Sequence, residues 1–170
     1  LTIALSLGSL FSVKTAAEAQ SITAAPDGTH TQVQEHQGQY DITGGTSAGH
    51  NLFHSFTDFG LNTGETANFI SPNANIANIL GRVTGGNPSL MNGLIQVTGA
   101  GSPNLFLMNP AGMVFGPNAS LNLPGSFTAT SATGIGLDSG GTFNAFGANN
   151  YNILVGSPNQ FNFSTLLPTV

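Results

Sequence analysis

The sequence predicts an all-β fold in which short strands stack into a parallel β-helix, a solenoid built by a single chain. Three observations predict this fold. Apolar runs of about three to five residues alternate with turns rich in Gly, Pro and Asn, and runs of that length suit strands rather than helices. Charged residues make up only 5% of the chain, so Gly, Asn, Ser and Thr fill the polar positions, as tight turns favour. Similar strand–turn units recur along the chain.

The interval between similar units predicts the length of one coil. Equivalent apolar positions recur after roughly 17–20 residues, with three strand–turn units in each interval, as one coil of a parallel β-helix requires. The pairs are Ile95 with Val114, Leu105 with Leu121, and Val114 with Ala132. Stacking at this interval places inward apolar side chains in columns, and Asn or Thr side chains can then form hydrogen-bonded ladders between coils.

A β-sandwich of hairpins is the rival fold. It favours longer strands and two-residue Asn-Gly or Asp-Gly turns. The chain has only two such dipeptides, Asn92-Gly93 and Asp27-Gly28. The pattern therefore favours the β-helix over the sandwich.

Composition excludes several classes of function. The chain has 170 residues, enough for one domain, with two basic residues, Lys14 and Arg82, against seven acidic ones. A net charge of −5 with so few cations argues against nucleic acid as a partner, because binding to its phosphate backbone requires cationic side chains. Without cysteine the chain has no disulfide framework and no Cys-ligated metal site.

Residues 1–19 are predicted to be a secretory signal peptide. Leu1–Val13 is an apolar run too short to span a bilayer as a helix. Ala17 and Ala19 supply the small residues that a signal peptidase reads, with cleavage before Gln20. The basic n-region and the initiator Met are missing, and a buried N-terminal strand or helix is the alternative. The interpretation makes residues 20–170 an exported domain, secreted or displayed at the cell surface.

The two ends of residues 20–170 differ from the middle. Weak strands are predicted at the start, near 22–24, 31–33 and 39–42. We expect them to cover the end of the solenoid, because a first coil exposes its strand edges. After Thr133 the sequence becomes glycine-rich, with further strands predicted at 143–146, 151–155 and 161–164. No charged tail closes this end, so we expect the chain to be the front of a longer solenoid.

One stretch organises the middle of the chain, Asn104–Gly116. Two apolar runs, 105–108 and 113–115, flank the turn Asn109-Pro110-Ala111-Gly112. Pro110 fixes φ and lacks an N–H, and Gly112 can adopt positive φ at little cost. This stretch is therefore predicted to form one corner of the repeat.

The most aromatic segment, 51–59, is predicted to form a buried wall, because three of its residues are Phe. His54, Ser55 and Asp58 offer the residue types of a catalytic triad, but on one strand they face both sides, whereas a triad needs them to converge. His54 is therefore predicted to be a hydrogen-bonded structural residue. Arg82 is predicted to stabilise a turn or to pair with a carboxylate.

No catalytic site, metal site or cofactor is predicted. Polysaccharide-cleaving β-helix enzymes gather several carboxylates, or a basic residue with acid partners. The acidic residues here are scattered; they are Asp27, Glu35, Asp41, Asp58, Glu65 and Asp138 after the first 19 residues. The four histidines, His30, His36, His50 and His54, lack the spacing of metal ligands.

Four segments together resemble the N-terminal domain of filamentous haemagglutinin, the secretion domain of the two-partner secretion pathway, and are similar to its cyanobacterial branch. They are N-L-F-H-S-F from Asn51, N-I-L-G-R-V-T-G-G from Asn78, N-L-F-L-M-N-P-A-G-M-V-F-G-P-N-A from Asn104 and G-S-F-T-A-T from Gly125. The resemblance covers roughly residues 21–140. It implies a right-handed parallel β-helix with an N-terminal cap and extra-helical strands.

The resemblance also implies a function. Members of the family are exported exoproteins, often adhesins or haemagglutinins. Their N-terminal domain directs passage through a dedicated outer-membrane β-barrel transporter of the TpsB type, which carries periplasmic POTRA domains. The chain is thus expected to be a secretion module without enzymatic activity, exported by the Sec system and through the outer membrane, and nucleating β-helix folding outside. The full exoprotein is expected to bind a host-cell or surface ligand.

Two other functions remain as alternatives at this point. The domain itself can be an adhesin that binds carbohydrate or protein through its aromatic segment. It can also be a polysaccharide-active β-helix enzyme, although the scattered carboxylates argue against that class.

Two motifs of the family map onto turns of this chain. The motif N-P-N-G-I falls on Asn109, Pro110, Ala111, Gly112 and Met113, with Ala111 and Met113 departing from it. The motif N-P-N-L has a partial match in Ser71, Pro72, Asn73 and Ala74. Two roles stay open for both turns: contact with the transporter, and formation of turns required for folding.

Overall fold

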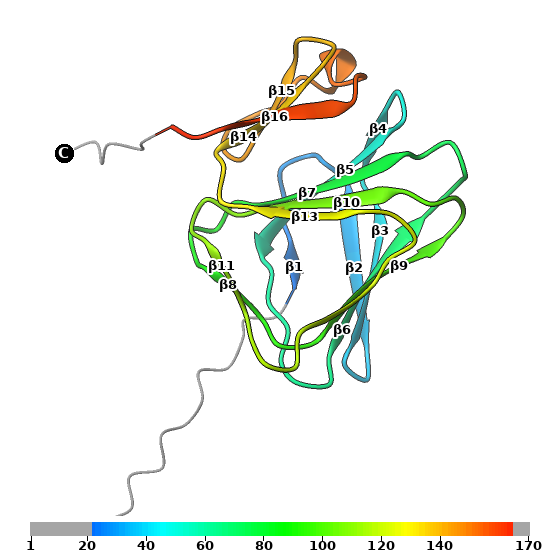
Figure 1. Cartoon of the computed structure of the whole chain (residues 1–170), viewed down its shortest axis with the longest axis vertical. Helices are drawn as coiled ribbons and strands as arrows, with labels where there is room; N and C mark the ends of the chain where they lie inside the picture. The colour runs from blue at the N-terminus through cyan, green and yellow to red at the C-terminus, as the bar shows by residue number, and fades with distance from the viewer. Residues whose placement is uncertain (1–21, 165–170) are drawn as a thin grey trace, which may run out of the picture.

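The computed structural model describes residues 22–164 (Figure 1). The predicted signal peptide, with Ala17, Ala19 and Gln20, lies outside the described residues. The described part of the chain consists of β-strands, turns and one short 3-10 helix. None of its helices is long and apolar enough to cross a membrane.

The strands form three sheets of a solenoid and one additional sheet. Sheet A contains β1 (Thr23–Ala24), β4 (Thr46–Ala48), β5 (Asn51–Asp58), β7 (Asn78–Val83), β10 (Asn104–Met108) and β13 (Phe127–Thr130). Sheet B contains β2 (Thr31–His36), β3 (Gln39–Gly44), β6 (Thr66–Ser71), β9 (Leu94–Gly99) and β12 (Ser120–Asn122). Sheet C contains β8 (Ser89–Met91) and β11 (Met113–Phe115). Sheet D contains β14 (Gly134–Leu137), β15 (Thr142–Asn144) and β16 (Pro158–Asn162), with the 3-10 helix η1 (Tyr151–Ile153) before β16.

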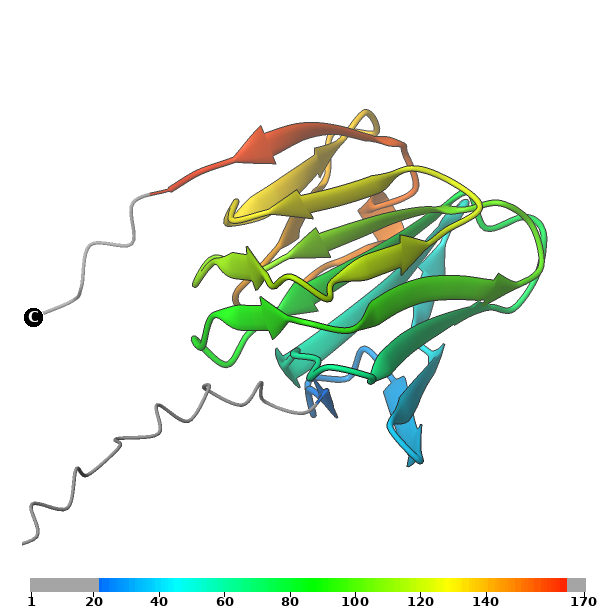
Figure 2. The same cartoon turned by 60° about the horizontal axis from the view of Figure 1, so that its bottom comes forward.

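The coils stack by parallel pairing, as predicted. The chain runs through β6, β7 and β8 and then through β9, β10 and β11, visiting sheets B, A and C in turn. Figure 1 looks nearly along the solenoid axis and shows these sheets as three sides of a triangle, and Figure 2 shows the coils stacked. Each strand pairs in parallel with the strand one coil earlier. The β-helix prediction is confirmed, and the sandwich of hairpins is wrong.

The predicted coil length of 17–20 residues is wrong. One inward column consists of Leu52, Ile79, Leu105 and Phe127, in steps of 27, 26 and 22 residues. Ile95 pairs with Leu121 rather than with Val114, so Leu105 does not pair with Leu121, and Ala132 lies beyond the last strand of the coils. Because every strand offers an apolar residue, hydrophobicity alone matched strands from different sides of the triangle.

The start of the described chain covers the first coil, as predicted. β2 pairs antiparallel with β3 at the edge of sheet B, and β1 and β4 pair antiparallel with β5 in sheet A. These strands take up the backbone groups that the edge of a first coil would otherwise leave unpaired. The N-terminal cap is therefore a set of antiparallel strands.

Sheet A separates two apolar clusters. Its inward residues, among them Leu52, Phe56 and Ile79, join the solenoid core. Its outward residues Phe53, Leu80 and Met108 pack against Ile135 and Phe143 of sheet D and against Leu154, which follows η1. Figure 1 shows sheet D lying over the outer side of sheet A. Both faces of β5 are therefore buried, which explains why the aromatic segment has no clean alternation.

The strands after Thr133 stand outside the coils, as the resemblance implied. β14 pairs antiparallel with both β15 and β16. The strand predicted at 151–155 is wrong: residues Tyr151–Ile153 form η1, whose start is capped by the Asn150 side chain accepting a hydrogen bond from the Asn152 N–H. A capping asparagine competes with strand pairing for the local backbone groups.

Asparagine side chains form a ladder along the outer face of sheet A, as the stacking predicted. Asn78 Nδ2 donates to Asn51 Oδ1 at 3.0 Å, and Asn104 Nδ2 donates to Asn78 Oδ1 at 3.1 Å. The ladder continues because Asn104 Oδ1 accepts the Ser126 N–H at 3.0 Å. Asn51 and Asn78 are buried, so each amide depends on its neighbours for hydrogen bonds.

We expect Asn78→Ala to lower the free energy of unfolding by about 1–3 kcal/mol, because it leaves Asn51 Oδ1 and Asn104 Nδ2 without their partners. Urea unfolding of the purified chain measures the change. Asn118→Ala is the matched control, since Asn118 is exposed and its amide bonds only to the Thr63 hydroxyl. Equal losses in the two variants would show that the buried ladder has no special weight.

Candidate functional site

The corner between β10 and β11 is built around the buried Asn109 side chain. Asn109 is 1% exposed, and its Nδ2 donates to Ser89 Oγ at 2.9 Å and to the Asn87 carbonyl at 3.0 Å. Its Oδ1 accepts the Ala111 N–H at 2.9 Å. The side chain therefore closes its own turn and joins it to the turn one coil earlier. These contacts give Asn109 a structural role in the corner.

Gly112 completes this turn through its backbone. Its N–H donates to the Asn109 carbonyl at 2.9 Å, and its carbonyl accepts the Ser89 N–H at 3.0 Å. Its φ of 102° lies in the region that favours glycine. A Cβ at this position would meet no atom within 4 Å, so a larger residue would be opposed by backbone conformation rather than by a clash.

The two departures from the family motif fit their places in the turn. Ala111 uses only its backbone N–H in the turn, which any residue but proline supplies. Met113 is partly buried and packs against the solenoid core. An apolar side chain suffices at that position, so methionine replaces the isoleucine of the motif without losing the core contact.

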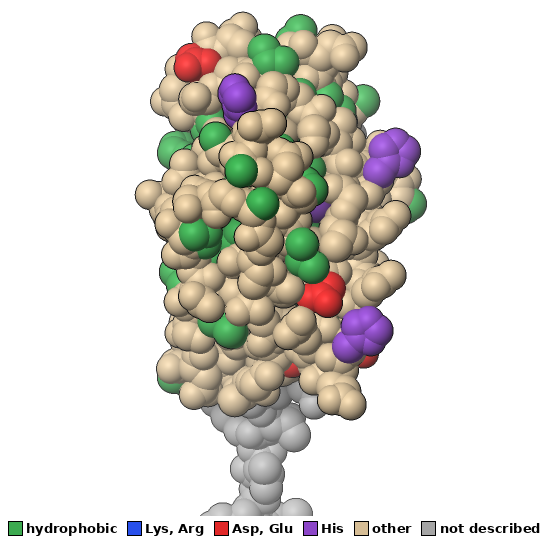
Figure 3. All heavy atoms as spheres, turned by 90° about the vertical axis from the view of Figure 1, so that its right-hand side faces the viewer, with side chains coloured by type: hydrophobic (Ala, Val, Ile, Leu, Met, Phe, Trp, Pro, Cys, Tyr) green, Lys and Arg blue, Asp and Glu red, His purple; other side chains and the backbone are tan. Residues whose placement is uncertain are grey.

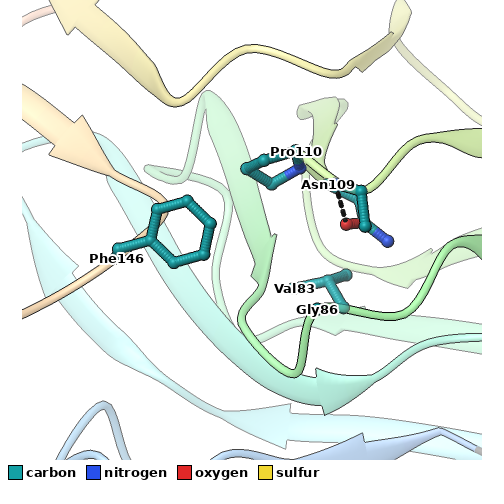
Figure 4. A pocket seen from close by; sticks show the side chains of 6 residues that line it. Val83, Gly86, Asn109, Pro110 and Phe146 are labelled. Carbon is teal, nitrogen blue, oxygen red and sulfur yellow. Dashed lines mark hydrogen bonds between the residues drawn. The ribbon is translucent and has the colours of Figure 1, made fainter. Parts of the chain in front are cut away.

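A pocket of about 190 Å³ lies beside the Asn109 turn (Figure 4). It is lined by Val83, Gly86, Asn109, Pro110, Ala111 and Phe146. In Figure 4 Phe146 lies across the pocket from Pro110 and Val83, so the segment that follows β15 and the coils contribute opposite walls. The polar atoms of Asn109 are engaged within the corner. The pocket therefore offers mainly apolar contact, suited to an uncharged side chain, and none of its lining residues is an acid, a base or a thiol.

The partial second motif forms a different corner. The motif begins at Ser71, the last residue of β6, where the chain leaves sheet B for sheet A, whereas the Asn109 turn lies between sheets A and C. Ser71 is buried and Pro72, Asn73 and Ala74 are exposed. Ser71 Oγ donates to the Asn73 carbonyl at 3.3 Å, and Asn73 Oδ1 accepts the Asn75 N–H at 3.0 Å. The structure does not bring the two motifs to one corner.

Arg82 pairs with a carboxylate, as predicted, and also donates hydrogen bonds to a serine hydroxyl and to two backbone carbonyls. Its Nη2 lies 2.8 Å from Asp27 Oδ2, and its Nε donates to Ser55 Oγ at 2.9 Å. Its Nη1 donates to the carbonyls of Asn144 and Gly147, at 2.7 and 2.9 Å. Arg82 is only 3% exposed, so these acceptors replace water around the guanidinium.

Asp27 is held ionised by the same contacts. Burial by itself would raise the pKa of Asp27, but hydrogen bonds from Ser55, Thr29 and Arg82 outweigh it and lower the pKa to about 2. Sequence reasoning missed this carboxylate as the partner, because the chain offers six candidate acids after residue 19 and no local signal selects one.

His54 is structural but, contrary to the prediction, it is not hydrogen-bonded: neither ring nitrogen has a hydrogen-bond partner among the described residues. The ring is fully buried inside the solenoid, 5.9 Å from the Phe69 ring and 6.2 Å from the Phe56 ring. Gly81, its partner in β7, faces the same crowded core, where a Cβ would lie 3.1 Å from Leu107 and 3.2 Å from Phe56. Burial lowers the pKa of His54 to about 3, so the ring is neutral at physiological pH.

The three triad-type residues of this segment do not converge. His54 faces the solenoid core, whereas Ser55 Oγ is held on the other face of β5 by Arg82 and Asp27. The aromatic segment also loses its suggested role as an adhesive surface, because Phe53, Phe56 and Phe59 are at most 2% exposed. The predicted buried wall is confirmed.

The remaining acidic residues bind backbone or amide groups near turns and strands. Glu35 accepts the Gly38 N–H, Glu65 the Asn62 N–H, Asp138 the Ser157 N–H, and Asp58 the Asn87 amide. Hydrogen bonds from Asn68 and Gln39 lower the pKa of Asp41. Within residues 22–164 no group of three or more His, Cys, Asp or Glu side chains is placed to hold a metal ion.

The described surface carries few charges, and those it carries are acidic. Arg82 is the only Lys or Arg among residues 22–164, and it is buried. Figure 3 shows one face on which neutral side chains predominate, with scattered hydrophobic, acidic and histidine side chains. Recognition at such a surface depends on shape, apolar contact and backbone hydrogen bonds rather than on attraction between charges.

These features define the class of the chain as a parallel β-solenoid domain with a capped first coil and an extra-helical sheet. A model of the TPS secretion domain matches residues 20–167, which is most of the chain. The chain therefore belongs to the family of two-partner secretion (TPS) domains, as the four segments of resemblance indicated, and is a module of a secreted two-partner exoprotein. The comparison with curated proteins gave no match.

We expect Asn109→Ala to lower the free energy of unfolding by about 1–3 kcal/mol, because the buried Ser89 hydroxyl, the Asn87 carbonyl and the Ala111 N–H all lose their partner. Chemical denaturation followed by far-UV circular dichroism measures the loss. Ala111→Asn, which restores the residue of the family motif, is the control and should change the free energy of unfolding by less than about 1 kcal/mol. Unchanged stability in Asn109→Ala would contradict a structural role for this amide.

The buried His54 predicts a loss of stability in mild acid. Between pH 6.5 and 4 the unfolded chain takes up a proton on His54 that the folded chain cannot, so the free energy of unfolding falls by about 1.4 kcal/mol per pH unit from this residue. Asp27 contributes its own loss only below its unfolded pKa of 3.8, as the pH falls towards 2. Urea unfolding at several pH values should show a shallower slope in His54→Leu. His36→Gln, which replaces an exposed histidine, is the control and should keep the slope of the parent chain. A slope in His54→Leu as steep as in the parent chain would contradict the prediction.

Proposed function

We propose that this chain is the secretion-directing module of its exoprotein. A TpsB-type outer-membrane transporter with POTRA domains recognises the module after Sec export, with residues 1–19 as the signal peptide, and the module then nucleates β-helix folding outside the cell. Membership in the TPS family supports the module's place in two-partner secretion. The observation that carries the nucleation role is the difference between the two ends of the solenoid.

The end formed by β11, β12 and β13 is open. Each of these strands pairs on one side only within its solenoid sheet. Phe115 and Leu121 stack in register on Met91 and Ile95, which are 0% and 1% exposed, yet they are themselves 45% and 50% exposed. Inward residues that are buried in one coil are thus left uncovered in the last.

This open end also lacks the usual protection of strand edges. Charged side chains commonly prevent an exposed edge from pairing with another strand. No Asp, Glu, Lys or Arg occurs between Arg82 and Asp138, a segment that includes the last coil. An unprotected edge above an uncovered apolar core is suited to receive another coil in register, and this would extend the solenoid.

The pocket beside the Asn109 turn is the part of the folded surface that we propose for transporter contact. Pro110 and Ala111 line it together with Phe146, whereas the Asn109 amide is committed to the corner. Variants of Pro110 and Ala111 therefore test recognition, and variants of Asn109 and Gly112 test folding.

We expect secretion of the chain, supplied with a Met start, to require the cognate transporter barrel. Asn109→Ala and Gly112→Val should reduce secretion together with stability, because both disturb the corner.

Pro110→Ala should change the free energy of unfolding by less than about 1 kcal/mol and still lower secretion, because it alters the pocket that we propose for transporter contact. Secretion is measured as the extracellular fraction in cells with and without the barrel, and binding to glycan arrays by the purified chain tests the adhesin alternative. Secretion without the barrel would contradict the proposed function.

A further inference from the structure

We infer that Arg82 is a staple through which the N-terminal cap, the coils and sheet D fold as one cooperative unit. The consequence for export rests on the proposed function. The chain cannot complete its fold until the segment 144–156 has passed through the transporter after the coils. Neither the family match nor the turn motifs assign this role to Arg82.

The staple joins three parts of the chain that are distant in sequence. Arg82 itself lies in β7, on the outer face of sheet A. Its guanidinium contacts Asp27 in the cap and two carbonyls, of Asn144 and Gly147, beside sheet D. The guanidinium also lies 5.7 Å from the centre of the Phe143 ring, a residue of β15. A planar cation with several donors can hold such a set of acceptors at once.

Other contacts tie the same two ends together. Thr29 Oγ1 and the Tyr151 hydroxyl lie 2.9 Å apart, and Thr29 Oγ1 also donates to Asp27 Oδ1. Asn51 Nδ2 donates to the carbonyls of Leu154 and Gly156, at 2.9 and 2.7 Å. The cap and first coil are therefore bonded directly to the segment 144–156, although more than 100 residues separate Asn51 from Leu154 along the chain.

Without the segment that follows the coils, the outer face of sheet A is incomplete. Phe53, Leu80 and Met108 would lose their cover, and Arg82 would keep Asp27 and Ser55 but lose both carbonyl acceptors. An apolar sheet face left in water is costly, and the guanidinium, no longer covered, would have water in place of its two carbonyl acceptors. The coils alone are thus not the folding unit, even though all their strands precede Thr133.

The coupling predicts that a substitution in the cap accelerates hydrogen exchange in sheet D, and that a substitution in sheet D accelerates exchange in the cap. Asp27→Ala removes a cap carboxylate that contacts Arg82, Ser55 and Thr29 and no residue of sheet D. Hydrogen exchange of the full chain, followed by mass spectrometry at pH 7, should show at least about tenfold faster exchange in residues 134–162 as well as in 22–36. In the reverse direction, Phe143→Ala should accelerate exchange in residues 22–36 by a similar factor.

Matched controls separate coupling from general loss of stability. Asp58→Ala removes a half-buried carboxylate bonded only to the Asn87 amide, and Phe146→Ala removes a ring that is 39% exposed. Both should leave exchange in the distant segment within about twofold of the parent chain. Tyr151→Phe, which removes only the hydroxyl bonded to Thr29, should give an intermediate acceleration at both ends.

Each outcome decides the inference. Faster exchange confined to the mutated end, in both Asp27→Ala and Phe143→Ala, would overturn it. If Asp27→Ala does not fold while Asp58→Ala does, loss of one cap carboxylate has unfolded the coils and sheet D together, as the inference requires. Exchange is measured on purified protein, so this result stands whether or not secretion depends on the transporter, and failure of the proposed function remains distinguishable.

Discussion

The burial of sheet A on both faces is the constraint on which the other features depend. Its inner residues fill the solenoid, and its outer residues need a second cover, which sheet D supplies. A cation on a covered face must be neutralised and fully hydrogen-bonded. For that reason the carboxylate of Asp27 and the carbonyls of Asn144 and Gly147 converge on Arg82. The cap, the coils and the extra-helical sheet are thereby linked at one buried side chain.

The low content of charged residues follows from stacking. Strands of adjacent coils lie about 4.8 Å apart, so identical side chains in register come into contact, and like charges there would repel. An amide avoids this conflict because it donates to one neighbour and accepts from the other, as in the ladder of Asn51, Asn78 and Asn104. The same constraint leaves no Asp, Glu, Lys or Arg in the last coil, where Phe115 and Leu121 remain exposed and the strand edges stay unprotected.

The family motif at residues 109–113 divides into an inner and an outer part. Asn109 and Gly112 build the corner, one by a buried amide and the other by positive φ. Pro110 and Ala111 line the pocket, and Phe146, in the segment after β15, closes it from the other side. A motif with both parts can serve folding and recognition at once, since a correctly formed corner is what sets the shape of the pocket.

The sequence by itself determined the strand-and-turn repeat, the Asn109 corner, the capping strands and the buried aromatic wall, because turn residues and strand-length apolar runs act locally. Only the tertiary structure decided the register of the coils, the partner of Arg82, the isolation of His54 and the helical turn at Tyr151. Apolar residues occur in every strand, so Ile95 stacks on Leu121 rather than on Val114 for reasons of turn length that hydrophobicity does not encode. Likewise, the choice of Asp27 among six acids is made by contacts between segments distant in sequence, which no local pattern specifies.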